Sequence, residues 1–193
     1  MKVFEIFDTS EVKVEDPSLR KYINLEAKLI QKGREREKFG RTKINVIERI
    51  INLLCVPGHR GKKHKIMTGH ASGKFSKNAN VVIAALKIVQ QKTNSNPIQV
   101  LVTALENSAP GDEVTTIEYG GARYPQAVDV SPMRRLNIAL RNLVHGAQDK
   151  AFGKKKKIHE TLAEEIILAS QKSSESLAIA KRNESEKQAD SAR

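Results

Sequence analysis

Residues 113–148 read EVTTIEYGGARYPQAVDVSPMRRLNIALRNLVHGAQ, and this stretch contains the strongest structural signals in the chain. Its first half has two β-prone runs that flank Gly120 and Gly121, the residues that a two-residue primed turn requires. We therefore expect a β-hairpin over residues 113–130. With the glycines in the turn, the facing pairs are Tyr119 with Ala122, Glu118 with Arg123, and Ile117 with Tyr124.

The predicted hairpin has two unlike faces. One face carries Ile117, Tyr119 and Tyr124, and the other face carries an ion pair. Pro125 removes a backbone donor that a wider sheet needs, and a lone two-stranded ribbon is only marginally stable in water. The ribbon is therefore expected to project from the molecule and to be stabilised by a partner.

The second half of the stretch predicts a helix that reaches about Gln148. Ser131 stands at the N-cap position and Pro132 at the first helical position. One side of this helix should pack against the core, and its apolar residues are Met133, Leu136, Ala139, Leu140, Leu143, Val144 and Ala147. The opposite side is basic and polar, with Arg134, Arg135, Arg141, Asn142 and His145.

Apolar residues at helical spacing predict further helices on both sides of this stretch. The expected segments are 18–33 capped by Ser18, 42–55 capped by Thr42, a helix from Ser76 or Asn78 to about 93, 97–105, 158–171, and a last helix from Ser173 or Ser174. Aromatic residues make up 4% of the chain and Trp is absent, so the core must be built from Ile, Leu, Val and Ala. The expected fold is mainly α, in a single domain of 193 residues.

Positive charge is concentrated in the first half of the chain. The whole chain has 34 Lys plus Arg against 22 Asp plus Glu, a net charge of +12, and residues 57–77 contain no acid at all. A basic field of this size favours a nucleic acid partner, because Lys and Arg release counterions from the phosphates that they contact. A merely solvated surface would interleave acids with bases, and a membrane surface would need an apolar helix face that residues 57–77 lack.

Other compartments and classes are disfavoured by what the chain contains. Its longest apolar run, Val81–Leu86, is far shorter than the roughly 18 residues of a membrane span. The acidic and apolar N-terminus does not resemble a signal peptide, and the lone Cys55 agrees with a reducing compartment. We therefore expect no membrane partner.

Three motifs suggest chemistry but fit it poorly. The glycines around Gly69 and Gly73 have the wrong spacing for a P-loop, and Phe75 stands where a magnesium-binding hydroxyl is needed. The zinc-ligand candidates, which have no CxxC pair, are Cys55, His59, His64 and His70. The GxxG stretch 58–61 matches the KH loop but lacks the surrounding strands. No catalytic residue, metal, cofactor or small-molecule substrate is therefore expected.

Five motifs follow one another along the chain: NPIQVLV (96–102), ALEN (104–107), YGGARYP (119–125), VDVSPMRR (128–135) and ALR (139–141). This ordered series resembles the ribosomal protein S-seven family of the small subunit. The resemblance covers roughly residues 42–190. Three features resemble the archaeal and eukaryotic type of the family: the sequence NPIQ at residues 96–99, the long basic insertion after Cys55 and the extra N-terminal segment.

The resemblance implies a bundle of about six helices with one protruding hairpin. It also implies binding to the 3′ major, or head, domain of small-subunit rRNA, a role in nucleating head assembly, and a cytoplasmic location on the ribosome. The hairpin would lie near the exit-site tRNA and the mRNA path, and other small-subunit proteins would be neighbours. The segments are an acidic extension (1–17), a basic strap (34–43), a basic loop (57–77), the hairpin (113–130) and the C-terminal helices (131–193).

Candidate contact residues follow from these segments. For rRNA they are Arg34, Arg36, Lys38, Arg41, Lys43, Arg60, Lys62, Lys63, Lys65, Lys74, Lys77, Arg134, Arg135, Arg141, Lys154, Lys155 and Lys156. Near tRNA and mRNA they are Tyr119, Gly120, Gly121, Arg123 and Tyr124. Two alternatives use the same basic surface, namely an RNA-processing or RNA-modifying enzyme, and an architectural protein that binds DNA and RNA alike.

Overall fold

The computed structural model describes residues 2–4, 6–26, 39–56, 59–60, 65–66 and 71–193. In these residues six α-helices are the main elements: α1 (Val46–Cys55), α2 (Phe75–Thr93), α3 (Pro97–Ser108), α4 (Pro132–Ala151), α5 (Ile158–Ser170) and α6 (Leu177–Ser191). A 3₁₀ helix, η2 (Gly40–Lys43), precedes α1. Three antiparallel strand pairs complete the described structure: β1 (Lys2–Val3) with β2 (Phe7–Asp8), β3 (His59–Arg60) with β4 (Lys65–Ile66), and β5 (Asp112–Tyr119) with β6 (Ala122–Asp129). The mainly α class is confirmed.

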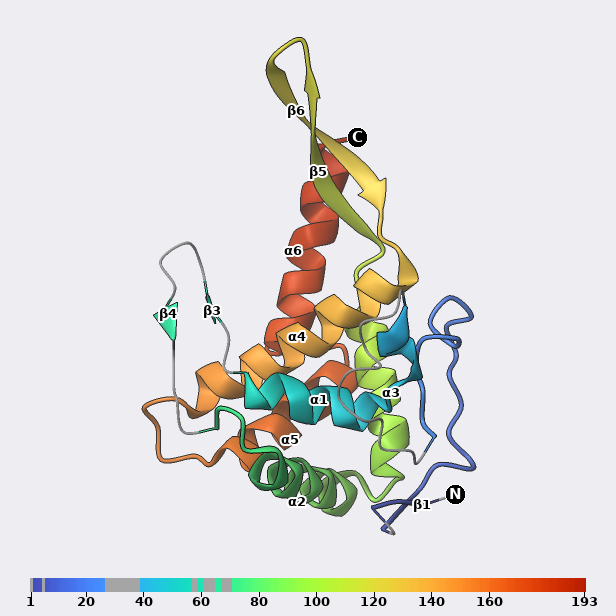
Figure 1. The fold of residues 1–193 in the computed structure, drawn as a ribbon, viewed down its shortest axis with the longest axis vertical. Helices are drawn as coiled ribbons and strands as arrows, with labels where there is room; N and C mark the ends of the chain where they lie inside the picture. Colours follow the sequence, from blue (N-terminus) through green and yellow to red (C-terminus); the bar gives the residue numbers. More distant parts are fainter. Residues whose placement is uncertain (1, 5, 27–38, 57–58, 61–64, 67–70) are drawn as a thin grey trace.

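Helix α5 lies at the centre of the bundle. It packs against α2, α3 and α4, while α1 lies across α2 and α4 (Figure 1). The core is aliphatic, as the composition predicts, and its largest completely buried side chains are Leu19, Ile47, Ile51, Leu86, Ile98, Leu101, Leu105, Leu136, Leu140, Leu143, Leu162 and Ile166. Burial of each such side chain contributes about 1.5–3 kcal/mol to folding.

Asparagine caps begin two of the helices. The Asn45 side chain accepts a hydrogen bond from the Ile47 amide at 2.8 Å, and the Asn96 side chain accepts one from the Ile98 amide at 3.0 Å. The predicted Thr42 cap is wrong, because Thr42 lies within η2 and its hydroxyl donates to the Phe39 carbonyl. Helix α1 therefore starts three residues beyond η2, at Val46.

Other helix starts differ from the prediction by a few residues. Helix α2 begins at Phe75, so Asn78 lies inside it, where its amide donates to the Ala71 carbonyl at 2.9 Å. Helix α6 begins at Leu177, and its N-cap is Ser176 rather than Ser173 or Ser174. Ser131 does stand at the N-cap position of α4, but its side chain makes no capping hydrogen bond.

The predicted helix from Ser18 to Gly33 is absent from the part of this segment that the structure describes, residues 18–26. Residues 17–22 form a turn, and Asn24 then pairs with Asn45 in an isolated β-bridge. The Asn24 amide also donates to the Lys43 carbonyl at 2.8 Å. These bonds to η2 and α1 hold the chain extended, while Leu19 and Ile23 still reach the core.

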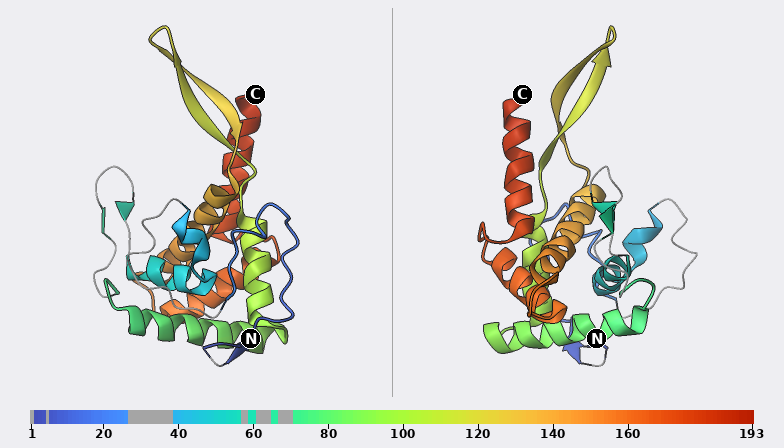
Figure 2. Two further views of the ribbon diagram at one scale, coloured as in Figure 1. Left: turned by 45° about the vertical axis from the view of Figure 1, so that its right-hand side comes forward. Right: turned by 90° about the vertical axis from the view of Figure 1, so that its left-hand side faces the viewer.

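The hairpin β5–β6 confirms its predicted register. Tyr119 faces Ala122, Glu118 faces Arg123 and Ile117 faces Tyr124. Gly120 and Gly121 have φ of 58° and 81°, the left-handed region that a type I′ turn needs. The hairpin projects from one end of the bundle beside α6, and the N-terminus lies at the other end (Figures 1 and 2).

Helix α6 holds the base of the hairpin. The Gly111 amide donates to Glu186 Oε1 at 3.1 Å, the Ser185 hydroxyl donates to the Asp112 carbonyl at 3.1 Å, and an Arg193 Nη2–Asp112 Oδ2 ion pair spans 2.6 Å. The ribbon is therefore stabilised at its base by its own chain. The expectation of an external partner concerns only the outer part.

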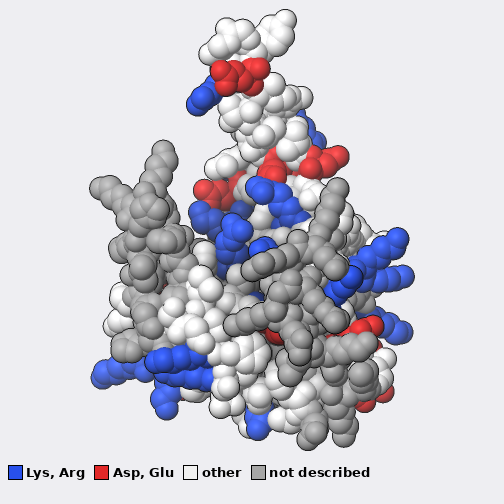
Figure 3. All heavy atoms as spheres, viewed as in Figure 1, with Lys and Arg blue, Asp and Glu red and all other residues white. Residues whose placement is uncertain are grey.

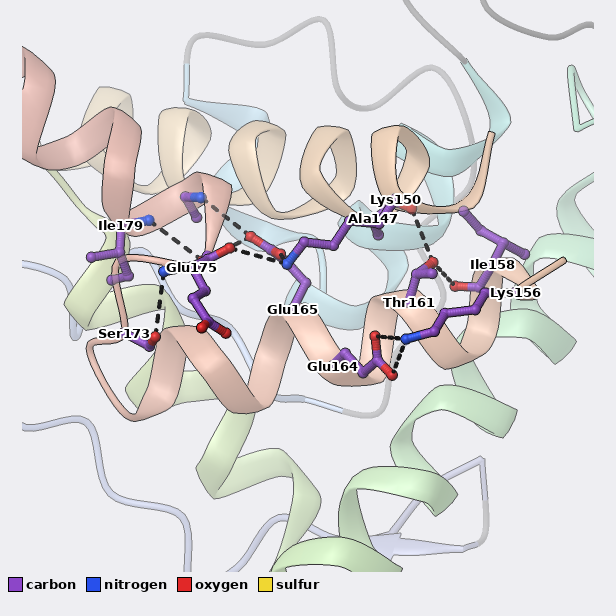
Figure 4. Close-up of polar contacts among 12 residues, drawn as sticks. Ala147, Lys150, Lys156, Ile158, Thr161, Glu164, Glu165, Ser173, Glu175 and Ile179 are labelled. Atoms are coloured by element: carbon purple, nitrogen blue, oxygen red, sulfur yellow. Dashed lines mark hydrogen bonds and ion pairs between the residues drawn. The ribbon is translucent and has the colours of Figure 1, made fainter. Parts of the chain in front are cut away.

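A buried carboxylate joins α4, α5 and α6. Glu165 is completely buried; it accepts hydrogen bonds from Lys150 Nζ at 2.7 Å, the Ser176 hydroxyl at 2.7 Å and the Ala178 amide at 3.3 Å. Gly146 lies against it, and a Cβ at residue 146 would meet Glu165 Oε1 at 2.7 Å. This cluster fixes the position of α6 on the bundle (Figure 4).

Candidate nucleic-acid interface

The packing face of α4 is confirmed, because six of its seven predicted apolar residues are buried and only Met133 is partly exposed. The basic side is more varied than the sequence indicates. Arg134 and Arg141 are exposed, whereas Arg135 is partly buried. The three arginines also differ in their partners, so they offer different capacities for a phosphate.

Arg135 is used inside the molecule. Its guanidinium donates to the Ser18 hydroxyl at 2.6 Å and to the Pro110 carbonyl at 3.1 Å, and it lies 3.1 Å from Asp16 Oδ2. Partial burial of Asp16 tends to raise the pKa of its carboxyl, but the Ser18 hydroxyl and amide and the Arg135 guanidinium hold that pKa below its usual range. Arg135 therefore ties the N-terminal segment to the turn before β5.

Arg134 forms an exposed ion pair across to the base of the hairpin. Its Nε lies 2.6 Å from Glu113 Oε1, and its Nη2 donates to Glu113 Oε2 at 2.8 Å. This bidentate contact raises the pKa of Arg134. A phosphate that binds Arg134 must compete with Glu113, although an exposed pair of this kind contributes only about 0–1 kcal/mol.

A cavity of about 320 Å³ lies between η2, α1 and α4, and we call it the α1–α4 cavity. Its lining residues are Arg41, Ile44, Arg49, Asn52, Leu53, Val56, Asn137, Leu140 and Arg141, all of them described, and they include three arginines and no Asp or Glu. Like charges gathered without a carboxylate create a positive field that favours an anion.

Arg49 forms the inner part of the α1–α4 cavity. It is only 8% exposed, and its Nη2 donates to Asn137 Oδ1 at 2.5 Å. Burial, with a smaller contribution from the neighbouring charge of Arg41, lowers the pKa of Arg49 to about 10. The guanidinium therefore stays charged at neutral pH.

A second cavity of about 280 Å³ adjoins the first one. The two share Asn137 and Arg141, and the second is lined further by Tyr22, Phe39, Ser131, Met133, Arg134 and Ile138. Aromatic and arginine side chains in one groove are the groups on which unpaired bases stack. Together the cavities form a continuous basic groove along α4.

The remaining lysines and arginines that are predicted to contact rRNA are distributed around the molecule. Lys74 and Lys77 are exposed at the start of α2, and Lys154 and Lys155 are exposed before α5. Lys156 forms an ion pair with Glu164 at 2.9 Å. Lys43 is exposed, and it also interacts with another residue. Beyond the described residues lie Arg34, Arg36, Lys38, Lys62 and Lys63, together with the side chains of Arg60 and Lys65.

The hairpin presents an apolar outer surface. Tyr119 is 82% exposed, Tyr124 58% and Ile117 44%, and the three lie on one face as predicted. The opposite face has the Glu118–Arg123 pair at 3.7 Å. In Figure 3, Lys and Arg gather at the lower left and beneath the hairpin base, while the outer hairpin shows one acidic and basic pair. The hairpin is therefore unlike the basic groove.

The chemical motifs gain no support from the geometry. Cys55 Sγ accepts a hydrogen bond from the Asn78 amide at 3.2 Å, while His64, His70 and the side chain of His59 lie outside the described residues. No three His, Cys, Asp or Glu within the described ranges are arranged to hold a metal ion. No described helix is long and apolar enough to cross a bilayer.

Residues 19–193 match the family model of ribosomal protein S7p/S5e. The chain is also 48% identical to the small ribosomal subunit protein uS7 of the archaeon Nanoarchaeum equitans, over the whole of this chain and 99% of that protein. The chain belongs to the S7p/S5e family. It is therefore a structural component of the small ribosomal subunit and not an enzyme, as the sequence motifs predict.

The sequence predicts only some of the residues that line the basic groove. Arg41, Arg134 and Arg141 were predicted, whereas Arg49, Asn52 and Asn137 were not. In the sequence Arg49 and Asn52 belong, with Asn45 and Glu48, to a narrow polar stripe on an otherwise apolar helix, and a solvent-facing stripe has the same pattern. The signal that the sequence does contain is an arginine with no acid three or four residues away on a strongly apolar helix.

Proposed function

We propose that this S7p/S5e protein binds the 3′ major domain of small-subunit rRNA and nucleates assembly of the subunit head. The observation that supports this most strongly is the α1–α4 cavity, where three arginines converge without a carboxylate among the described residues. Shape and phosphate contacts would dominate, because side chains cannot read the deep groove of A-form RNA.

The basic elements would act together as a clamp on an RNA junction. The bundle core holds the groove along α4, the start of α2 with Lys74 and Lys77, and the segment with Lys154 and Lys155 at fixed positions. Lysines and arginines on elements that are already in place before binding lose little entropy when they contact phosphates. This arrangement favours one RNA shape over others.

The hairpin would have a different task, near the exit-site tRNA and the mRNA path. Its outer surface has exposed tyrosines and almost no net charge, because Glu118 pairs with Arg123. Such a surface gains little from counterion release, so it suits contacts within an assembled ribosome better than primary capture of rRNA. The C-terminal helices suit a basic neighbouring ribosomal protein, because residues 158–193 contain seven Asp and Glu against five Lys and Arg.

The test is a binding titration of the full chain with a minimal head-domain junction of small-subunit rRNA. An unrelated structured RNA of equal length serves as the control, and both are measured across a salt series. We expect the junction to bind at least about a thousandfold more tightly, with the margin retained as salt rises. Equal binding that weakens in parallel for both RNAs would contradict the proposal and leave only the charge of +12.

A further inference from the structure

The chemical make-up of the α1–α4 cavity points to more than a phosphate. Its walls include four aliphatic side chains. Ile44 and Leu140 are almost completely buried, whereas Leu53 and Val56 offer accessible apolar surface to a flat ring. Its volume of about 320 Å³ lies at the small end of the roughly 300–1,000 Å³ of small-ligand sites. Inorganic phosphate alone would leave the apolar walls without a partner.

Apart from Asn52, whose side-chain amide offers both a donor and an acceptor, the polar side chains that face a ligand in the cavity are donors. Asn137 Oδ1 is occupied by Arg49 Nη2 at 2.5 Å, so the Asn137 amide nitrogen is the group left to contact a ligand. Arg41 and Arg141 are exposed and have no ion pair with any described residue. A ligand that fits these groups must have a negatively charged group and also hydrogen-bond acceptors along the edge of a flat ring.

A nucleotide with guanine fits these requirements. The N7 and O6 atoms of guanine are two adjacent acceptors, whereas adenine places an amino donor beside its N7. Unpaired bases in RNA are commonly splayed out, packed against side chains and hydrogen-bonded at their edges. The cavity opens between a 3₁₀ helix and two helices, so an RNA strand that runs along α4 passes its mouth.

We propose that the α1–α4 cavity takes one unpaired nucleotide of the bound RNA. Its base, preferentially guanine, lies against the aliphatic walls with its acceptor edge toward Arg49 and Asn137, and its phosphate contacts Arg41 and Arg141. The adjoining cavity with Tyr22 and Phe39 lets the strand continue toward Arg134. This inference rests on the proposed rRNA binding and adds the ligand class of one pocket.

The direct test uses the isotopically labelled full chain and four probes: GMP, AMP, ribose 5-phosphate and inorganic phosphate. We expect GMP to shift the side-chain amide signals of Asn52 and Asn137 and the Nε signals of Arg41 and Arg141. Phosphate and ribose 5-phosphate should shift only the arginine signals. If they shift the Asn137 amide as GMP does, the site is an anion site only and the proposal is overturned. AMP that matches GMP overturns the guanine preference.

Two variants separate the pocket from general charge. Asn52→Phe fills the cavity while leaving the Arg49–Asn137 bond in place, and it should weaken GMP binding about tenfold or more, the size of a lost base contact. The exposed Lys87 on α2 provides the control Lys87→Ala, which should leave GMP binding unchanged. Thermal unfolding of both variants verifies that they fold. Unchanged GMP binding in folded Asn52→Phe would overturn the proposal.

A second readout uses RNA itself. Abasic substitutions are placed one at a time at the unpaired positions of the head-domain junction. One position should cost about tenfold or more in affinity for the native chain and little for Asn52→Phe, because both changes remove the same contact. If the junction binds specifically and no position behaves in this way, rRNA binding stands and the nucleotide pocket falls.

Discussion

Glu165 has the largest predicted effect on stability of any single residue discussed. It is completely buried, and its charge is balanced by Lys150 Nζ at 2.7 Å and by the Ser176 hydroxyl. Glu165→Ala should lower the free energy of unfolding by about 3–5 kcal/mol, because the partly buried Lys150 ammonium loses its counterion and keeps only the Glu175 carbonyl at 3.1 Å. Urea unfolding measures this change.

Glu164 provides a matched control one position earlier. It pairs with Lys156 at 2.9 Å, but both side chains are partly exposed. Glu164→Ala should therefore cost less than about 1 kcal/mol. Equal losses for the two variants would show that α6 is not held by the buried cluster.

Gly146 tests the same cluster by volume instead of charge. A Cβ at this position would lie 2.7 Å from Glu165 Oε1 and 3.0 Å from the Leu177 Cβ. Gly146→Ala should therefore destabilise the protein by about 1–3 kcal/mol through overpacking.

Gly111 is the comparison glycine, because its nearest atom to an added Cβ is Glu186 Oε1 at 3.8 Å. Gly111→Ala should change the midpoint of thermal unfolding by a much smaller amount. If Gly146→Ala melts at the same temperature as the native chain, the close packing of α4 on Glu165 is wrong.

Asp16 gives the N-terminal segment a pH dependence. The pKa of its carboxyl is lowered in the folded state, so ionised Asp16 stabilises the fold above its ordinary pKa of 3.8. This contribution is lost as the pH falls through the folded-state pKa. The difference in unfolding free energy between the native chain and Asp16→Asn should therefore be largest at neutral pH and shrink in acid. A difference that does not change between pH 7 and pH 2 would contradict the Asp16–Arg135 contact.

At the scale of elements, the outer hairpin should be dispensable for folding. Tyr119 and Tyr124 are exposed, while the anchoring contacts of Asp112 and Gly111 lie at the base. Replacement of residues 118–123 by Asn-Gly closes Ile117 onto Tyr124 with a two-residue turn and keeps the register. We expect an unchanged urea midpoint and an rRNA affinity within about threefold of the native chain.

The same hairpin variant should be defective in the assembled subunit. Binding of exit-site tRNA to small subunits reconstituted with the variant tests this expectation. A large loss of free rRNA affinity would instead make the ribbon a primary anchor.

Local signals explain which elements the sequence predicted correctly. The register of the hairpin follows from Gly120 and Gly121, because a primed turn fixes which residues face each other. The segment after Ser18 has helical spacing as well, yet it forms a turn, since Asn24 bonds to Asn45 and Lys43. Those partners lie about twenty residues away, and a periodicity argument does not include them.

At the scale of the whole molecule, the sequence predicts the positive charge of the candidate site but not how its side chains are arranged. Arg135 looked equivalent to Arg134, yet Asp16 and Ser18 reach it from the N-terminal segment. The cavity depends on Arg49 and Asn137, which are 88 positions apart and meet only in the folded bundle. Composition and motifs can thus identify an RNA-binding family member. The pairing of distant side chains decides which of its lysines and arginines remain available to bind RNA.

The central claim is that the arginines of the α1–α4 cavity, and not net charge, determine binding to rRNA. The most direct test compares Arg41→Ala/Arg141→Ala with Lys87→Ala/Lys92→Ala, which removes two exposed charges of α2 instead. Affinity for the head-domain junction is measured across a salt series. The arginine variant should bind at least about tenfold more weakly, with a salt slope reduced by about 2, and the lysine variant should match the native chain. Equal losses in the two variants would contradict the claim.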